Sequence, residues 1–300
     1  MSAIFEQIFV LLVFVAVGAV LSGCKIVRLE HSKILSSLLV YLFLPCNIFK
    51  TFSTNFTVKY ITERYSLLLI SLVLLLCIIL ISHLISKLFA KDIYSRYIYE
   101  YSLISPNYGY MGYPLVENLL GSAGLVDFMV FALPVSLYIY TIGFAKLTKR
   151  PINCKKLLNP AVIATGLGIL FGLTGLTLPS VFNKICTTAS SCVGPISMLL
   201  TGMVIAQFNV KVILHNARVY ILTLIRLIAL PLSAGLILSC FFDTSIVQIV
   251  VMFLALPCGM NTVVFPRLVD EDCHIGAGLA LVSTVLSCVT IPLIISFFHI

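Results

Sequence analysis

Long apolar stretches, separated by short polar ones, run through the whole of this 300-residue chain. Most of them approach the ~20 residues that a helix needs to cross the hydrocarbon core of a bilayer. The pattern predicts ten transmembrane helices, at about residues 4–22, 33–50, 65–89, 97–121, 125–145, 160–178, 188–208, 217–241, 245–268 and 275–298. The short alternating strands of an outer-membrane barrel are not part of this pattern. We therefore expect an all-α polytopic membrane protein.

The composition leads to the same class. Hydrophobic residues make up 60% of the chain, charged residues make up 10%, and the mean hydropathy is +1.13, which excludes a soluble domain of this size. The formal charge of +8 does not indicate a nucleic-acid partner, because the basic residues lie in short loops. The ten cysteines are scattered without metal-ligand spacing, so we expect no metal site. The hydropathy predicts that a lipid bilayer surrounds the protein.

Lys and Arg residues gather in alternate connections between the predicted helices. One set of connections carries fourteen of them: Lys25, Arg28, Lys33, Lys87, Lys91, Arg96, Lys146, Lys149, Arg150, Lys155, Lys156, Lys211, Arg218 and Arg267. The other set carries four: Lys50, Lys59, Arg64 and Lys184. Because basic loops stay in the cytoplasm, we expect both termini outside, the 146–158 loop inside, and a multi-pass protein of the cytoplasmic (plasma) membrane.

Two of the predicted helices contain residues that a transmembrane helix usually avoids. Proline lacks a backbone N–H, glycine eases departure from helical geometry, and asparagine brings an amide that hydrocarbon cannot solvate. These residues are Pro106, Asn107, Gly109, Gly112 and Pro114 in the fourth segment, and Pro257, Gly259, Asn261 and Pro266 in the ninth. A membrane helix can carry such a break only where the freed backbone groups face protein or a water-filled cavity.

The prolines also indicate an internal repeat. Five helices per half is an odd number, so two related halves would be inserted in opposite orientations, as in many secondary transporters. Pro45 and Pro195 are 150 residues apart, Pro106 and Pro257 are 151 apart, and Pro114 and Pro266 are 152 apart. Pro134 has no such partner. We expect a first five-helix repeat at 1–145, a connecting loop at 146–158 and a second five-helix repeat at 159–300.

Short motifs occur in a characteristic order along the whole chain. They are Leu44-Pro45 in the second segment, the run from Asn107 to Pro114 in the fourth, the run from Gly194 to Gly202 in the seventh, Ala255-Leu256-Pro257 in the ninth, and Ser283-Thr284, Ser287 and Thr290-Ile291-Pro292 in the tenth. This order resembles the auxin efflux carrier family of bacterial permeases, relatives of the plant auxin efflux carriers. In one departure, Ser136 precedes the run from Tyr140 to Gly143, where the family often has an Asn.

The resemblance implies ten helices in two inverted five-helix repeats, with broken helices 4 and 9 that cross each other. It also implies a transport domain of helices 3–5 and 8–10. Helices 1, 2, 6 and 7 would form a scaffold that is often used for dimer contact, so a homodimer through these helices is an expectation. Family members are associated with efflux or uptake of small organic acids such as malate, malonate or auxin.

The two breaks are the expected binding site for a carboxylate. The second half of each broken helix should begin near Gly112 or Thr262, where free N–H groups and the positive end of the helix dipole suit an anion. Asn107 and Asn261 could orient the ligand or only cap the broken backbone. Asn47 could line the site or bond between helices. The expected substrate-binding residues are Asn107, Gly109, Gly112, Pro114, Pro257, Gly259, Asn261, Thr262 and Asn47.

Two charged residues lie within the predicted spans. Arg226, in the eighth, is either a counter-charge for the substrate or a side chain that snorkels to the interface. Glu100, early in the fourth, is either a protonatable coupling group or an interfacial carboxylate. No cofactor is expected, and coupling to a proton or a sodium ion stays open.

These features predict a secondary transporter (permease) that moves a small organic anion by alternating access. One alternative is an anion-conducting channel, since broken backbone also lines pores. Another is a membrane solute sensor, which an attached signalling domain would favour. An enzyme is not expected, because the sequence contains no HExxH, GxSxG or paired acidic motif.

Overall fold

The computed structural model describes residues 2–27, 29–151, 158–176, 178–207 and 216–298, and these residues form helices without a β-strand. Six helices in the described ranges are long and apolar enough to cross a membrane: His31–Asn55, Val58–Phe89, Tyr108–Thr148, Ser180–Val204, Ala217–Ser239 and His274–Phe297. Shorter apolar helices are Phe9–Gly23, Pro160–Thr174 and Thr244–Ala255. The all-α polytopic class is therefore confirmed, whereas ten crossings stay a prediction. Residues 152–157 of the predicted 146–158 loop lie outside the described residues.

The first half of the chain contains the first interrupted helix. In order, its helices are α1 (Ser2–Gly23), α2 (Leu29–Leu38), η1 (Leu39–Phe43), α3 (Leu44–Asn55), α4 (Val58–Phe89), α5 (Ile93–Ile104), η2 (Tyr108–Gly112), α6 (Tyr113–Tyr138), η3 (Ile139–Gly143) and α7 (Phe144–Thr148). The η elements are short π-helical turns. Gly121, with φ at 68°, interrupts the helical geometry inside α6, so the boundary predicted between the fourth and fifth segments falls at this glycine.

The second half contains the other interrupted helix. Its described helices are α8 (Pro160–Thr174), α9 (Ser180–Ser191), α10 (Val193–Ile205), α12 (Ala217–Leu224), η5 (Ile225–Ala229), α13 (Leu230–Ser239), α14 (Thr244–Ala255), α15 (Asn261–Arg267) and α16 (His274–Phe297). Asn159 caps α8, because its side-chain Oδ1 accepts a hydrogen bond of 3.1 Å from the N–H of Val162.

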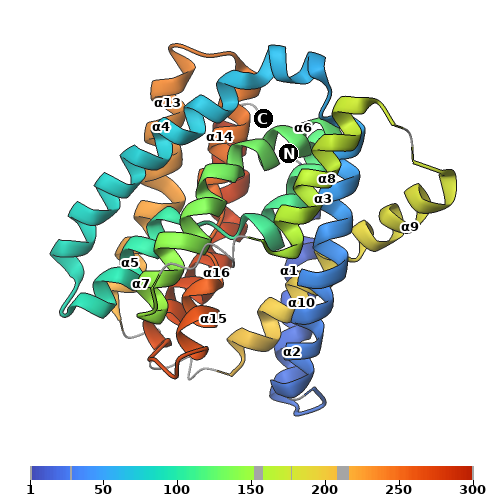
Figure 1. Ribbon diagram of the computed structural model, residues 1–300. Coiled ribbons are helices and arrows are strands. Elements are labelled where there is room, and N and C mark those ends of the chain that lie inside the picture. Colours follow the sequence, from blue (N-terminus) through green and yellow to red (C-terminus); the bar gives the residue numbers. More distant parts are fainter. Residues whose placement is uncertain (1, 28, 152–157, 177, 208–215, 299–300) are drawn as a thin grey trace.

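The helices form two groups. In Figure 1, α1, α2, α3, α8, α9 and α10 lie together on the right, α4, α5, α7 and α13 lie on the left, and α14, α15 and α16 are nearer the middle. Glycines bring the right-hand helices into backbone contact: a Cβ on Gly202 of α10 would lie 1.9 Å from the carbonyl oxygen of Val15 in α1. Small residues of this kind are what close packing of membrane helices requires. The right-hand group contains the elements of the expected scaffold, and its separation from a transport domain stays a prediction.

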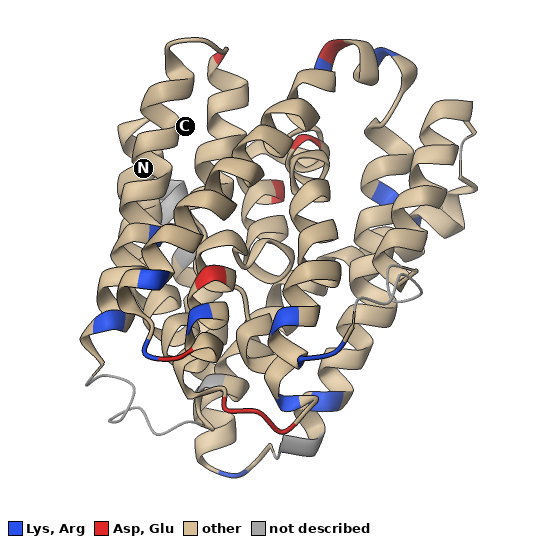
Figure 2. Ribbon diagram, turned by 60° about the vertical axis from the view of Figure 1, so that its left-hand side comes forward, with Lys and Arg blue, Asp and Glu red and all other residues tan. Residues whose placement is uncertain are grey.

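Basic residues are unevenly distributed over the bundle. Figure 2 shows that most of the Lys and Arg positions in the described ranges lie towards one end of the helices, the lower end in that view. This distribution agrees with the alternation of basic connections along the sequence.

Candidate functional site

The two interrupted helices cross at their breaks. The first break lies between α5 and η2, and the second lies between α14 and α15. The N–H of Asn107 donates a hydrogen bond of 2.8 Å to the carbonyl of Pro257, and the N–H of Gly259 donates one of 2.9 Å to the carbonyl of Ser105. Together these bonds form an isolated antiparallel bridge that is centred on Pro106 and Cys258. Each break thus satisfies backbone groups that the other has freed.

The sequence explains why the chain crosses here. Neither Pro106 nor Pro257 can donate a backbone hydrogen bond, so both positions leave helical geometry easily. Gly259 lets the two backbones approach, because a Cβ there would lie 3.1 Å from Oγ and 3.2 Å from the carbonyl oxygen of Ser105. Thr262 is buried and donates from Oγ1 to the carbonyl of Gly259 at 3.0 Å, which ties the start of α15 to the second break.

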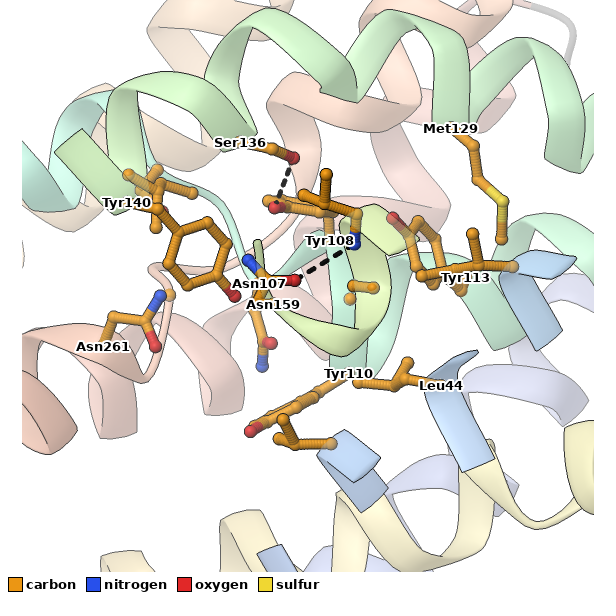
Figure 3. A pocket seen from close by; sticks show the side chains of 18 of the residues that line it. Leu44, Asn107, Tyr108, Tyr110, Tyr113, Met129, Ser136, Tyr140, Asn159 and Asn261 are labelled. Atoms are coloured by element: carbon orange, nitrogen blue, oxygen red, sulfur yellow. Dashed lines mark hydrogen bonds between the residues drawn. The ribbon is translucent and has the colours of Figure 1, made fainter. Parts of the chain in front are cut away.

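A cavity of about 190 Å³ lies beside the crossing. Four of the expected binding residues line it: Asn107, Gly109, Gly259 and Asn261. Most of the other lining residues come from η1, α3, η2, α6, η3 and α8, so the cavity lies between the expected scaffold and the expected transport helices. Figure 3 shows Asn107, Asn159, Asn261 and Tyr140 around one common space.

Two amide donors in this cavity have no hydrogen-bond partner among the described residues. The Nδ2 atoms of Asn107 and Asn159 are buried and have no hydrogen-bond partner among the described residues. Asn107 is 5% exposed and directly precedes η2. The first N–H groups of a helix have no acceptor within the helix. The first bonds in this turn are those from Met111 and Gly112 to the carbonyl of Asn107. A ligand that accepts hydrogen bonds would satisfy these groups, and the helix N-terminus adds a preference for negative charge.

Several lining residues were not among those predicted from the sequence. Tyr108, Tyr110, Tyr140 and Asn159 all line the cavity, and the hydroxyl of Tyr108 lies 2.7 Å from Oγ of Ser136. The three tyrosines belong to the motif runs of the fourth and fifth segments, but a single sequence does not tell which face of a helix meets the cavity.

Other expected site residues lie outside the cavity wall. A Cβ on Gly112 would meet the side chains of Leu256 at 2.7 Å and Phe128 at 2.9 Å, so this glycine serves helix packing. Pro114 begins the first turn of α6 and lies close to Gly194 of α10. Pro257 contributes its carbonyl to the crossing and Thr262 contributes its hydroxyl, as described above.

Asn47 forms a contact between helices. Its Nδ2 donates to Oε2 of Glu117 at 3.3 Å, and Nζ of Lys50 lies 3.8 Å from Oε1 of the same carboxylate. These contacts join α3 to α6, that is, the expected scaffold to the second half of the first broken helix.

Glu100 lies in a compact cluster of charges. Its carboxylate is 3% exposed and accepts a hydrogen bond of 2.6 Å from Nζ of Lys146. Nδ1 of His83 lies 2.9 Å from it and Nε of Arg96 lies 3.3 Å from it. The cluster joins α4, α5 and α7, and none of its members lines the central cavity.

Arg226 is fully buried and reaches the crossing from the side of η5. Its Nη1 donates to the carbonyl of Leu103 at 2.8 Å, its Nε donates to that of Leu256 at 3.3 Å, and its Nη2 donates to that of Phe253 at 3.4 Å. Leu103 lies in the last turn of α5, whereas Phe253 and Leu256 belong to the end of α14. Arg226 therefore holds the C-terminal ends of both broken half-helices, a role that differs from both roles predicted from the sequence.

A second cavity, of about 550 Å³, adjoins the first. Tyr110 and Met260 line both cavities. The second cavity lies between α2, α10 and α15, and its wall includes the basic residues Lys33 and Arg267. Nη1 of Arg267 donates to Oε1 of Gln207 at 3.0 Å.

Comparison with known proteins places this geometry in a family. A family model described as "Membrane transport protein" matches residues 3–153 and 148–295. The chain belongs to this membrane transport protein family. The family is the auxin efflux carrier family that the order of motifs indicated, so the resemblance is confirmed. As a member of the family, the chain is a transport protein of the membrane and not an enzyme.

Two archaeal members of the same kind are similar over much of their length. An uncharacterized transporter of Methanocaldococcus jannaschii is 26% identical, and the match covers 96% of each chain. An uncharacterized transporter of Methanothermobacter thermautotrophicus is 25% identical over 199 residues, which cover 62% of this chain and 63% of that one.

Proposed function

We propose that this membrane transport protein is a secondary transporter that carries a small organic anion, a carboxylate, across the cytoplasmic membrane. The observation that carries the proposal is Asn107, which points an unpaired amide into the cavity at the start of the half-helix η2–α6. A carboxylate accepts several hydrogen bonds and carries the charge that a helix N-terminus favours. The cavity of about 190 Å³ is smaller than the roughly 300–1,000 Å³ of drug-sized sites, which favours a substrate of few atoms.

Alternating access fits the positions of the two cavities and of Glu117. The Lys50–Glu117 and Asn47–Glu117 contacts tie the expected scaffold to the transport helices on one side of the crossing. Tyr110 and Met260 line both the central cavity and the larger one, where Lys33 and Arg267 would attract an anion. We infer that the inward route runs through the larger cavity, and that movement of the transport helices would close it and open the Glu117 side.

Carboxylate uptake by the purified protein in liposomes tests the proposal directly. We would measure a panel of labelled mono- and dicarboxylates, including malate and malonate, with wild-type protein and with Asn107→Ala and Asn261→Ala. A hydrogen bond to a charged group is worth about 1.5–3 kcal/mol, so each variant should lose about 10- to 100-fold in uptake at sub-saturating substrate. The double variant should lose less than the product of the two effects, because both side chains act on one ligand.

Asn118→Ala is the matched control. Asn118 lies on the same half-helix, but its Nδ2 donates to the carbonyl of Pro114 at 2.8 Å and it does not line the cavity. Its uptake should stay close to that of wild type. Saturable uptake supports a carrier. No uptake of any acid in the panel, or unitary current steps in planar bilayers, would contradict the proposal.

Orientation in the membrane is a separate part of the proposal. Both termini lie outside and the 146–158 loop lies inside, on the basis of the fourteen-to-four division of basic residues. Arg150 after α7 and Asp243 between α13 and α14 are both exposed. In a cysteine-free background, an impermeant maleimide added to intact cells should label Asp243→Cys and not Arg150→Cys. The reverse labelling pattern would overturn the orientation.

The scaffold helices are the proposed contact of a homodimer. Their outward residues Val181, Phe182 and Ile185 of α9 are exposed and apolar, which suits either a second copy or lipid.

A further inference from the structure

We propose that Arg226 takes the place of a coupling cation at the crossing of the broken helices, so that carboxylate transport does not depend on sodium. The inference rests on the proposed function and deepens it. It starts from the three carbonyl oxygens that the guanidinium holds, those of Leu103, Phe253 and Leu256.

These carbonyls have the character of a cation site. Where transporters break their helices, the freed carbonyls and the C-terminal ends of half-helices are the groups that coordinate sodium. In this protein the same kind of oxygen, from two different half-helices, lies 2.8–3.4 Å from the guanidinium nitrogens of Arg226. A sodium ion would have to displace a side chain that is 0% exposed and covalently fixed to η5.

The charge balance supports the same conclusion. The C-terminal end of a helix carries about half a negative charge, and α5 and α14 both end at Arg226. One guanidinium therefore offsets the two ends. No carboxylate within the described part of the chain forms an ion pair with Arg226, so the backbone is what holds this charge in place.

The carbonyl groups that Arg226 holds are close in sequence to the substrate site. Leu103 and Leu256 lie within four residues of Asn107 and Gly259, which line the cavity, whereas Arg226 itself does not line it. With the negative helix ends offset, the positive end of η2 and the amide of Asn107 are left for an anion. Arg226 is thus a positioning residue that acts through the half-helices and through its field.

The first test uses the wild-type protein. Uptake of labelled malate and malonate into liposomes should be the same within twofold when external NaCl is replaced by choline chloride. The thermal midpoint of the detergent-purified protein, measured without any substrate, should also be the same in the two salts. Sodium-dependent uptake or stabilisation of the wild type by sodium would overturn the inference. The stability measurement needs no transported acid, so its outcome is independent of whether the proposed function holds.

A pair of variants separates charge from hydrogen bonding. Arg226→Lys keeps the positive charge with a different donor geometry, and Arg226→Gln keeps two N–H donors without the charge. If Arg226 acts as a fixed cation, Lys should retain part of the transport, and Gln should raise the KM for the acid at least tenfold and lose most of the uptake. Equal or better transport by Gln than by Lys would show that Arg226 is only a hydrogen-bonding cap, and would overturn the inference.

Discussion

Replacing Gly109 by leucine should reduce carboxylate uptake to the level of empty liposomes and leave the protein folded and inserted. Gly109 lines the central cavity, and a Cβ built on it would have no heavy atom of the described residues within 4 Å. Its φ is not in the left-handed region, so a side chain fits the backbone. A leucine would therefore extend into a cavity of only about 190 Å³ and compete with the substrate for the same volume.

Gly166→Leu is the control for this experiment. Gly166 lies in α8, also has open space where a Cβ would be, and does not line the cavity. Its uptake and thermal midpoint should resemble those of wild type. Wild-type uptake by Gly109→Leu would show that the substrate does not use the central cavity.

Gly202→Val should have the largest effect on stability. The added Cβ would lie 1.9 Å from the carbonyl oxygen of Val15 and 2.8 Å from the N atom of Ala19, both in the backbone of α1. Backbone atoms cannot swing aside as a side chain can, so α1 and α10 must separate. Overpacking a well-packed core lowers the free energy of unfolding by about 1–3 kcal/mol and occasionally more. We expect a loss in the upper part of this range, because Gly18 of α1 also packs against the backbone of Leu199 in α10.

The thermal midpoint and the yield of monodisperse protein measure this effect. Gly166→Val, in α8 with open space at its Cβ, should keep both close to their wild-type values. If Gly202→Val unfolds at the same temperature as Gly166→Val, the close approach of α1 and α10 is wrong.

The helical class and the positions of the breaks could be predicted from local sequence. A lipid environment forces backbone groups to bond within a helix, so apolar length alone predicts where helices lie. Pro106, Pro257 and Gly259 mark the breaks because their own geometry and donors differ from those of other residues. The start of the second half-helix was less predictable. The sequence predicts it near Gly112, whereas the helical turn begins at Tyr108.

The face of each helix that meets the cavity could not be predicted. Gly109 and Gly112 are three residues apart in one helical stretch, yet the first meets the cavity and the second meets Leu256 and Phe128. The partners of Arg226 show the same difficulty, because Leu103 is 123 residues away in sequence. Such contacts depend on how distant segments pack, and a charged residue in a span indicates only that some partner must exist.

The central claim is that the substrate binds where the two broken helices cross. The most direct test is a structure of the protein with the carboxylate that liposome uptake identifies, added at saturating concentration. We predict density for the acid in the central cavity, with its carboxylate within hydrogen-bonding distance of Nδ2 of Asn107 and the first N–H groups of η2. Density only in the larger cavity beside Lys33 and Arg267, or elsewhere away from Asn107 and Asn261, would contradict it.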